Sequence, residues 1–228
     1  TSVSVPSTVT TIGNSAFSEN TDLAKLVLRK GLVSIGDNAF ANCTSLSSLV
    51  IPSTVTSVGE YTFRNCTGLT SAVIGDNVTL IDFEAFCNCT SLSDLVFGKN
   101  LNLIGDSAFA GCSKLTDLVI PNSVKTIAEY AFRDCTILKS VNIGSGIANI
   151  KDGAFSDDIS LREVVIYNKT VSFADLSFNR CKNVVFYGPD GGGTVKTFAK
   201  NHGFSYKNIV KTPLSADWFC LSETEYLY

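Results

Sequence analysis

The chain has 228 residues and a formal net charge of −3. Hydrophobic residues make up 45% of it and charged residues 17%, which is typical of a folded protein with a large core and excludes a disordered chain. The slightly acidic balance argues against a protein that binds nucleic acid or anionic lipid, and the sequence has no apolar run of the roughly 18 residues needed to cross a membrane.

A repeat of 23 residues runs through the sequence, and phenylalanine marks it most clearly. Phe recurs at this interval without an insertion, which is too regular to arise by chance. One unit of this length cannot bury its own apolar face, so we expect the units to stack and to bury each column of equivalent residues against its copies above and below. The phenylalanines of the column are Phe17, Phe40, Phe63, Phe86, Phe109, Phe132, Phe155 and Phe178.

The first element predicted after each Phe is a short strand with the pattern L-x-x-L-x-I. Leu46, Leu49 and Ile51 show this pattern, and the equivalent columns stay apolar in the other repeats. Neighbouring strands should lie about 4.8 Å apart in a parallel sheet on one face of the molecule. Parallel pairing needs a return path, which the remainder of each unit supplies.

The return path is predicted to contain a turn, a second short strand and a helical turn. Pro52 marks the turn in one unit, and Val55 and Val58 show the apolar spacing of the second strand. Residues 37–40 represent the helical turn, and an aspartate at its start would act as the N-cap. The predicted N-caps are Asp37, Asp106 and Asp152.

The combined pattern, L-x-x-L-x-I-P-x-x-V-x-x-I-G-x-x-A-F-x-x-C, resembles the BspA-like class of leucine-rich repeats. Residues 51–66 follow it well, and the resemblance covers roughly residues 1–187. It implies an α/β, mostly β, solenoid: a right-handed superhelix with a parallel sheet on one face and short strands and helical turns on the other. It also implies a bacterial or protozoan cell-surface or secreted protein that adheres to proteins of a host or neighbouring cell. The family brings no catalytic residues to carry over.

Both ends of the chain differ from the repeat. Thr1 begins inside a predicted strand, and the sequence has no Met, so we expect further repeats or a cap to precede it in a longer parent protein. A helix is predicted over residues 194–204, ending at Gly203, where it would cover the last open part of the core. The predicted division is an array of about eight repeats at 1–187, a capping segment at 188–212 and a tail at 213–228.

Cysteine forms a column three residues after the repeat Phe, and Asn20 and Asp158 take its place in two repeats. We interpret the column as buried, reduced thiols, because side chains stacked in register lie parallel and do not face one another. A disulfide between neighbours is the first alternative, and a zinc site is the second, although zinc usually takes paired ligands at short spacing. The members of the column are Cys43, Cys66, Cys89, Cys112, Cys135 and Cys181.

No catalytic residue, cofactor or metal site is predicted. His202 is the only histidine, so any Cys-His or Ser-His-Asp arrangement would have to use it. We expect this side chain at the surface near the end of the predicted helix. Residues 191–194 lack the Lys of a phosphate-binding loop and are predicted to form a flexible connection. An enzyme is therefore the least favoured class of function.

Five asparagines lie in N-glycosylation sequons, and the repeat itself generates three of them as Asn-Cys-Thr. Glycosylation would matter only in a secreted eukaryotic protein. The five are Asn42, Asn65, Asn77, Asn88 and Asn168.

Two columns of the predicted sheet should face solvent, because side chains alternate along a strand. One column is valine in most repeats, and the other begins with Lys25 and is Ser or an acidic residue in the later repeats. A row of exposed Val is unusual in a soluble protein, although Val also suits a strand. We interpret this face as a shallow binding groove. Its predicted ligand-contacting residues are Val50, Val73, Val96, Val119, Ser48, Ser71, Asp94, Asp117, Lys139 and Arg162.

The favoured function is a non-catalytic module of a cell-surface or secreted protein that binds a protein partner, as in adhesion, through this sheet face. We expect a monomer without a cofactor, a nucleic-acid partner or membrane insertion. The alternative is an architectural spacer or stalk that has no ligand of its own.

Overall fold

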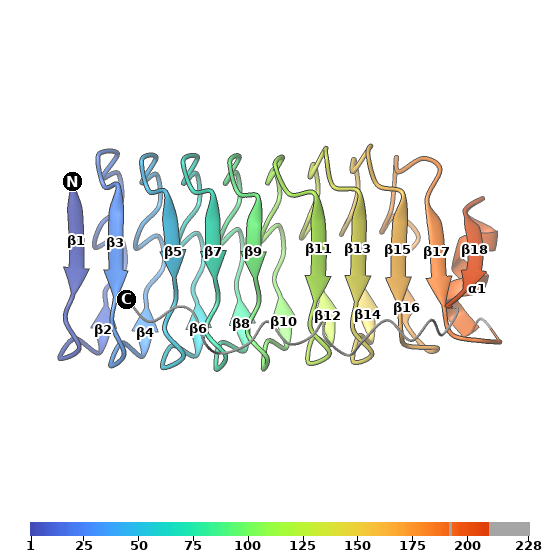
Figure 1. Ribbon diagram of the computed structural model, residues 1–228, viewed down its shortest axis with the longest axis horizontal. Helices are drawn as coiled ribbons and strands as arrows, with labels where there is room; N and C mark the ends of the chain where they lie inside the picture. Colours follow the sequence, from blue (N-terminus) through green and yellow to red (C-terminus); the bar gives the residue numbers. More distant parts are fainter. Residues whose placement is uncertain (192, 210–228) are drawn as a thin grey trace.

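The computed structural model describes residues 1–191 and 193–209, which form a straight solenoid (Figure 1). Each turn contributes one longer strand to one side and one two-residue strand to another. The longer strands are β1 (Ser2–Val5), β3 (Lys25–Leu28), β5 (Ser48–Val50), β7 (Ser71–Val73), β9 (Asp94–Val96), β11 (Asp117–Ile120), β13 (Ser140–Ile143), β15 (Glu163–Ile166) and β17 (Val185–Gly188). The short strands are β2 (Thr11–Ile12), β4 (Ser34–Ile35), β6 (Ser57–Val58), β8 (Leu80–Ile81), β10 (Leu103–Ile104), β12 (Thr126–Ile127), β14 (Asn149–Ile150) and β16 (Ser172–Phe173). The last two elements are α1 (Gly193–Asn201) and β18 (Ser205–Asn208).

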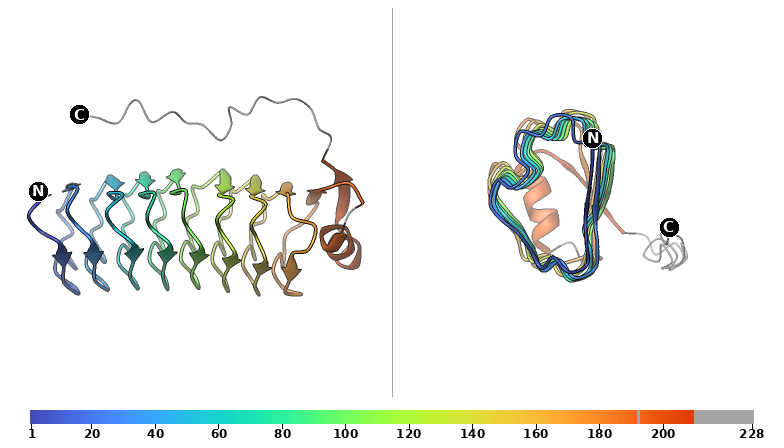
Figure 2. Two further views of the ribbon diagram at one scale, coloured as in Figure 1. Left: turned by 90° about the horizontal axis from the view of Figure 1, so that it is seen from below. Right: turned by 90° about the vertical axis from the view of Figure 1, so that its left-hand side faces the viewer.

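All strand pairs are parallel and join residues of neighbouring turns. Ser48 lies beside Ser71, and Ser71 lies beside Asp94, which is the predicted 23-residue register. The short strands form one eight-stranded sheet from β2 to β16. Viewed along the axis, the turns superimpose on one another (Figure 2). The predicted parallel-sheet solenoid is confirmed.

The longer strands form three sheets instead of the single sheet expected. Their hydrogen-bonded ladder is interrupted between β3 and β5 and between β9 and β11. The second interruption coincides with Phe97, which replaces the Ile or Leu of its column and packs edge-on against Phe109 with ring centroids 5.6 Å apart. A larger ring in this column leaves Phe97 half-buried, whereas its equivalents Ile74 and Ile120 are buried.

The core is built from stacked copies of the same side chains. The rings of Phe40, Phe63 and Phe86 are fully buried, with centroids 5.4 and 5.2 Å apart and nearly parallel planes. The stack extends from Phe17 to Phe178 at similar spacings. The Leu, Ile and Val columns of both strands are buried around it, so every turn depends on its neighbours for burial of its apolar side chains.

The segment between each short strand and the next longer strand is a series of tight turns and not a helical turn. Asn38 has a φ of +56° and Asn42 a φ of +62°, and most repeats have two such left-handed residues at the same positions. A right-handed helical turn cannot contain such residues. The prediction of a helical turn at residues 37–40 is therefore wrong.

The aspartates predicted as N-caps instead join one turn to the next. Asp37 Oδ1 accepts a hydrogen bond from the backbone N–H of Glu60 at 3.0 Å, and Asp106 Oδ1 accepts one from Glu129 at 2.9 Å. Asp152 Oδ1 accepts from the N–H of Leu176 in the same way. Backbone groups of the turns are also paired between repeats, as in the N–H of Phe40 donating to the carbonyl of Thr62. Hydrogen bonding between neighbouring turns thus extends beyond the two sets of strands into the tight turns.

The cysteine column lies inside these turns, and its predicted burial is confirmed. All cysteines in the described part of the chain are buried, and their thiols are free. Cys66 Sγ donates to the carbonyl of Phe40 at 3.3 Å, and Cys89 Sγ donates to that of Phe63 at the same distance. The thiol therefore packs as a small apolar group that also joins two turns by a weak hydrogen bond.

The C-terminal end of the core is covered by α1 and β18 (Figure 2). The helix begins at Gly193, one residue before the predicted start, and ends at Asn201, two residues before the predicted end at Gly203, and it buries Val195, Phe198 and Ala199. Phe198 lies 4.3 Å from the ring of Phe173 and within 6.0 Å of Phe178. The strand β18 was not predicted from the sequence; it pairs with β17. The predicted tail at 213–228 lies outside the described residues.

The Phe stack predicts where the array is most sensitive. Replacing Phe86 with Ala should lower the free energy of unfolding by about 3–5 kcal/mol, because a fully buried ring between two others leaves a cavity. Urea denaturation followed by far-UV circular dichroism measures this loss. The matched control is Phe17→Ala, at the half-buried end of the same stack, which should cost clearly less. Equal losses would contradict a stack that is stabilised from both sides.

Candidate functional site

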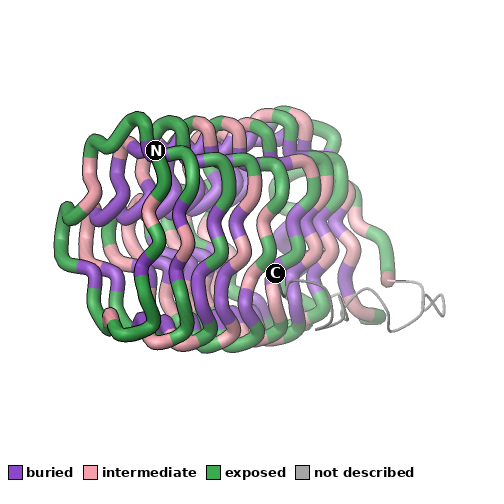
Figure 3. The backbone as a smooth tube through the Cα atoms, turned by 60° about the vertical axis from the view of Figure 1, so that its left-hand side comes forward, coloured by how far each residue is buried: buried purple, intermediate pink, exposed green. Residues whose placement is uncertain are grey.

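The outer face of the longer strands is the predicted binding surface, and the structure places its side chains as the alternation predicts. Inward residues such as Leu49 are buried, whereas Val50 is 55% exposed and Val119 is 48% exposed. Val96 is 37% exposed, and Val73 is half-buried. Buried and exposed residues alternate along the strands in Figure 3. These valines therefore form a partly exposed apolar column on neighbouring strands.

The polar column beside the valines is also on this face. Ser48, Asp94 and Asp117 are exposed, and Ser71 is half-buried. The hydroxyl of Ser140 donates to Asp117 Oδ1, so one carboxylate of the column is already bonded to its neighbour along the stack. The face combines an apolar column with an acidic one, which suits a partner with apolar and basic groups.

The two predicted basic residues have different roles. Lys139 precedes β13 and is exposed. Arg162 precedes β15, and its Nη1 donates to three backbone carbonyls, those of Ile159, Leu161 and Lys182, at 2.8–3.2 Å. Arg162 therefore links two turns by bonding to their backbone carbonyls. These bonds occupy Nη1, which is then not available to a ligand.

The apolar column continues beyond the predicted residues. Val165 pairs in register with Tyr187 of β17, whose ring lies 5.8 Å from Lys207 Nζ. Sequence reasoning missed Tyr187 because the interval from Val165 is 22 residues and not 23. Asn142 interrupts the column between Val119 and Val165, and it is half-buried.

Nucleophilic chemistry is disfavoured by the surroundings of the thiols and of His202. Burial raises the pKa of Cys66 to about 12 and that of Cys43 to about 11, so the reactive thiolate is not populated at neutral pH. His202 follows α1, where its Nδ1 lies 2.9 Å from the carbonyl of Phe198 and its ring stacks on the Phe198 ring. Its predicted place at the helix end is confirmed.

Two absences concern only the part of the chain that the structure describes, residues 1–191 and 193–209. No three or more His, Cys, Asp or Glu side chains within them are grouped so that they could hold a metal ion. Within the same residues, no helix has the length and apolar character needed to span a membrane.

The asparagines of the Asn-Cys-Thr sequons form a ladder along the stack. The amide of Asn65 donates to Asn42 Oδ1 at 2.8 Å, and the amide of Asn88 donates to Asn65 Oδ1 at 3.2 Å. The Asn42 amide donates to Glu19. These residues adopt left-handed φ angles, which Asn tolerates well, so the sequons arise from the needs of the turn. Their amide nitrogens are already engaged in the fold, whereas Asn77 is exposed.

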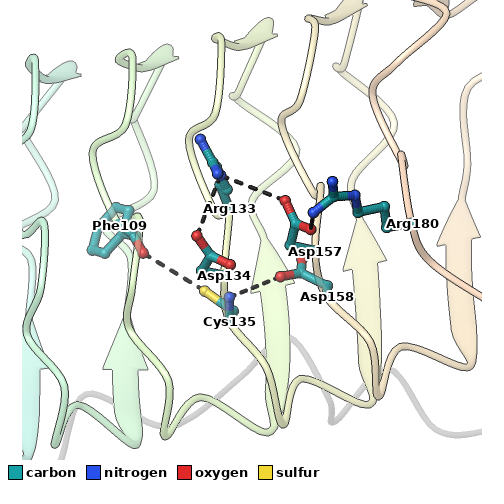
Figure 4. Close-up of polar contacts among 7 residues, drawn as sticks. All are labelled: Phe109, Arg133, Asp134, Cys135, Asp157, Asp158 and Arg180. Atoms are coloured by element: carbon teal, nitrogen blue, oxygen red, sulfur yellow. Dashed lines mark hydrogen bonds and ion pairs between the residues drawn. The ribbon is translucent and has the colours of Figure 1, made fainter.

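Asp158 is an exception within the cysteine column. Its Oδ1 accepts a hydrogen bond from the N–H of Cys135 at 2.8 Å, but Oδ2 is buried without a hydrogen-bond partner (Figure 4). Burial raises the pKa of the Asp158 carboxyl well above its usual value. Cysteines at the equivalent positions donate to the Phe carbonyl of the adjacent turn, and a protonated carboxyl, like a thiol, carries a hydrogen-bond donor.

The stacked parallel strands, the buried Leu, Ile and Phe columns and the exposed sheet together define a leucine-rich-repeat solenoid. A family model described as "BspA type Leucine rich repeat region" matches six copies over residues 1–115 and 61–185, and the chain belongs to this family. The sequence resemblance to this class is thereby confirmed.

Solved structures support the same fold. A leucine-rich repeat protein of T. pallidum is 29% identical, with a TM-score of 0.66 over 90% of this chain and 85% of the other. The pneumococcal vaccine antigen PcpA is 21% identical, with a TM-score of 0.66 over 92% of this chain and 68% of the other. A leucine-rich repeat protein of Eubacterium ventriosum is 21% identical, with a TM-score of 0.52 over 79% of this chain and 64% of the other. A search of curated protein sequences gave no match.

The raised pKa of Asp158 makes stability depend on pH. The folded protein holds the proton on Asp158 more tightly than the unfolded chain does. The stability that this proton contributes is fully present below the unfolded pKa of about 4, and it is lost as the pH rises through the higher folded pKa. Asp158→Cys should therefore raise the free energy of unfolding by about 1–3 kcal/mol at neutral pH, with a smaller gain at about pH 4.

Urea denaturation at a series of pH values measures this difference. Asp117→Asn, which changes an exposed carboxylate on the sheet face, is the control and should show little of this pH dependence. A gain for Asp158→Cys that stays constant with pH would show that Asp158 is ionised in the folded protein and would contradict the prediction.

Proposed function

We propose that this chain is a non-catalytic binding module of a cell-surface or secreted protein, and that it binds a protein partner through the outer face of its longer strands. Adhesion to a host or neighbouring cell is the role typical of the BspA-like class that the chain resembles. The cell-surface or secreted location rests on that resemblance and on the family match.

The observation that carries the proposal is the partly exposed valine column. Val50, Val96 and Val119 present branched apolar side chains to solvent from longer strands whose inward side chains pack on the core. Exposed apolar side chains that lie together on a rigid surface are typical of protein-binding sites. The stacked turns hold these side chains at fixed spacing, which lowers the entropy cost of binding a complementary surface.

The flanking charges favour a particular kind of partner. Asp94 and Glu163 are exposed beside the column, and Asp117 lies between them along the stack. Carboxylates beside an apolar column suit a partner with a basic rim around an apolar patch. Val165 and Tyr187 extend the surface toward the C-terminal cap.

A second candidate function is an architectural spacer, and the straightness of the stack favours it (Figure 1). In that role the array separates other parts of a longer protein, and the valines reflect only the preference of β-branched residues for strands. A binding module needs the side chains of the sheet face to contact its partner, whereas a spacer does not.

Charged substitutions on the sheet face separate these functions. Val96→Arg and Val119→Arg together should reduce binding to a protein partner at least about tenfold, because a guanidinium replaces an apolar contact at the centre of the surface. Binding of the labelled protein to an array of purified extracellular-matrix and serum proteins provides the measurement. Thermal unfolding checks that the variant is folded.

The matched control is Val33→Arg, an exposed valine that immediately precedes the short strand β4 and so lies away from the sheet face. It should leave binding unchanged. Equal binding by the sheet-face variant and wild type would reject this surface. An array on which wild type binds no protein would favour the spacer.

A further inference from the structure

A notch lies in the turns near the C-terminal end of the array, on a different part of the molecule from the sheet face. It is made by the turns after β12, β14 and β16, and it encloses about 190 Å³. Pockets that bury drug-sized ligands have roughly 300–1,000 Å³, so the notch is suited to a group about as large as one sugar ring.

The notch exists because one repeat has small residues where its neighbours have large ones. At the first left-handed position of the turn, Gly153 lies between Tyr130 and Leu176 in the stack. Three positions further on, Ser156 lies between Arg133 and Asn179. The middle repeat thus forms the floor and the two flanking repeats form the walls.

The floor carries a polar group without a partner. Ser156 is only 4% exposed, and its Oγ has no hydrogen-bond partner in the structure. This oxygen lies 3.3 Å from the position that a Cβ at Gly153 would occupy, and the Tyr130 ring leans into that position, so the hydroxyl lies beside the edge of the ring on the floor of the notch. A buried hydroxyl without a partner costs free energy, and a ligand hydroxyl that bonds to it would recover that cost.

The charges around the notch balance one another. Asp157 pairs with Arg180 at 2.9 Å and with Arg133 at 3.5 Å, and Asp134 pairs with Arg133 at 3.2 Å (Figure 4). Two guanidiniums therefore face two carboxylates, and the cluster has no net charge to attract an anion. These pairs use Nε of Arg133 and Nη1 of Arg180, and each guanidinium carries further N–H donors beyond these atoms.

The remaining groups match the chemistry of a neutral sugar. A sugar hydroxyl both donates and accepts, so it can add to guanidinium N–H groups and carboxylate lone pairs without breaking the existing ion pairs. The ring of Tyr130 is 41% exposed and leans over Gly153, where it offers an apolar surface to the C–H groups of a sugar. Asn179 adds an amide to the same wall.

We propose that the notch formed by Tyr130, Arg133, Gly153, Ser156, Asn179 and Arg180 binds one neutral monosaccharide unit of a glycan. The unit packs against the Tyr130 ring, and its hydroxyls bond to Ser156 and to the arginine–aspartate cluster. This site is separate from the valine column, so the array has one surface for protein and one for carbohydrate.

The chain contains its own control for this site. Tyr61 and Arg64 repeat the arrangement of Tyr130 and Arg133, with the guanidinium 5.4 Å from the ring centroid compared with 5.7 Å. In the next turn, however, Glu84 takes the position of Gly153 and pairs with Arg64 at 3.1 Å. Beside Tyr61, therefore, the position equivalent to Gly153 carries a side chain, and the polar floor seen beside Tyr130 is replaced by the Arg64–Glu84 pair.

Saturation-transfer difference NMR on the whole chain tests the proposal. The probes are the methyl glycosides of glucose, galactose, mannose and N-acetylglucosamine, with sialyllactose as an anionic probe and glycine as a zwitterionic one. At least one neutral glycoside should bind. Tyr130→Ala should weaken that binding about tenfold, whereas Tyr61→Ala should leave it unchanged.

Two further variants test the floor of the notch. Ser156→Ala introduces the residue found at the equivalent positions Ala41 and Ala110, and it should weaken binding several-fold. Gly153→Asn introduces the residue that occurs at Asn38, whose φ is +56°, and its side chain would displace the Tyr130 ring from its place over Gly153, so it should abolish binding. Thermal unfolding of each variant confirms the fold, and the Val96→Arg and Val119→Arg changes should not affect glycoside binding.

The proposal is overturned if no neutral glycoside binds, or if only sialyllactose or glycine binds. It is also overturned if Ser156→Ala and Tyr130→Ala, when folded, bind a glycoside as wild type does. The sheet-face experiment is unaffected by any of these results.

Discussion

Each turn of this molecule is stabilised by contact with a copy of itself. Backbone N–H groups of one turn donate to carbonyls of a neighbouring turn, in the strands and in the tight turns between them. The Phe rings, thiols and Asn side chains follow the same rule, with each side chain bonded or packed against its equivalent or near-equivalent 23 to 26 residues away. A single turn has no core, so fold and stability arise from the register.

Because each side chain packs against its copies in the adjacent turns, a residue that departs from the repeat changes the structure at that position. Phe97 enlarges an Ile column and coincides with a break in the ladder of longer strands. Asp158 places a carboxyl where other turns have a thiol. Gly153 lacks a side chain in its column, and the Tyr130 ring leans over it at the edge of the notch. The sheet face follows the repeat, whereas the notch depends on departures from it.

The repeated columns allowed the strands, the parallel pairing and the buried Cys and Phe stacks to be predicted, because apolar periodicity determines which side chains must face inward. The tight turns were not predicted, since Asp37 at the start of a short polar segment is equally typical of a helix N-cap. Asn and Asp at the left-handed positions, such as Asn42 and Asp134, were the available signal. Tyr187 was missed because its spacing is one residue shorter. The notch depends on a missing side chain, which only the folded stack reveals.

The register can be tested directly with two deletions that begin in β7, end in β9 and differ by one residue. Removing residues 73–95 deletes one whole period of 23 residues and joins Ala72 to Val96 in phase, whereas removing residues 73–94 joins it to Leu95 and turns the following side chains to the opposite face. Urea denaturation of both variants is the measurement. The first variant should unfold cooperatively near the wild-type midpoint, and the second should lose that transition. Equal midpoints for the two variants would contradict the dependence of this fold on its register.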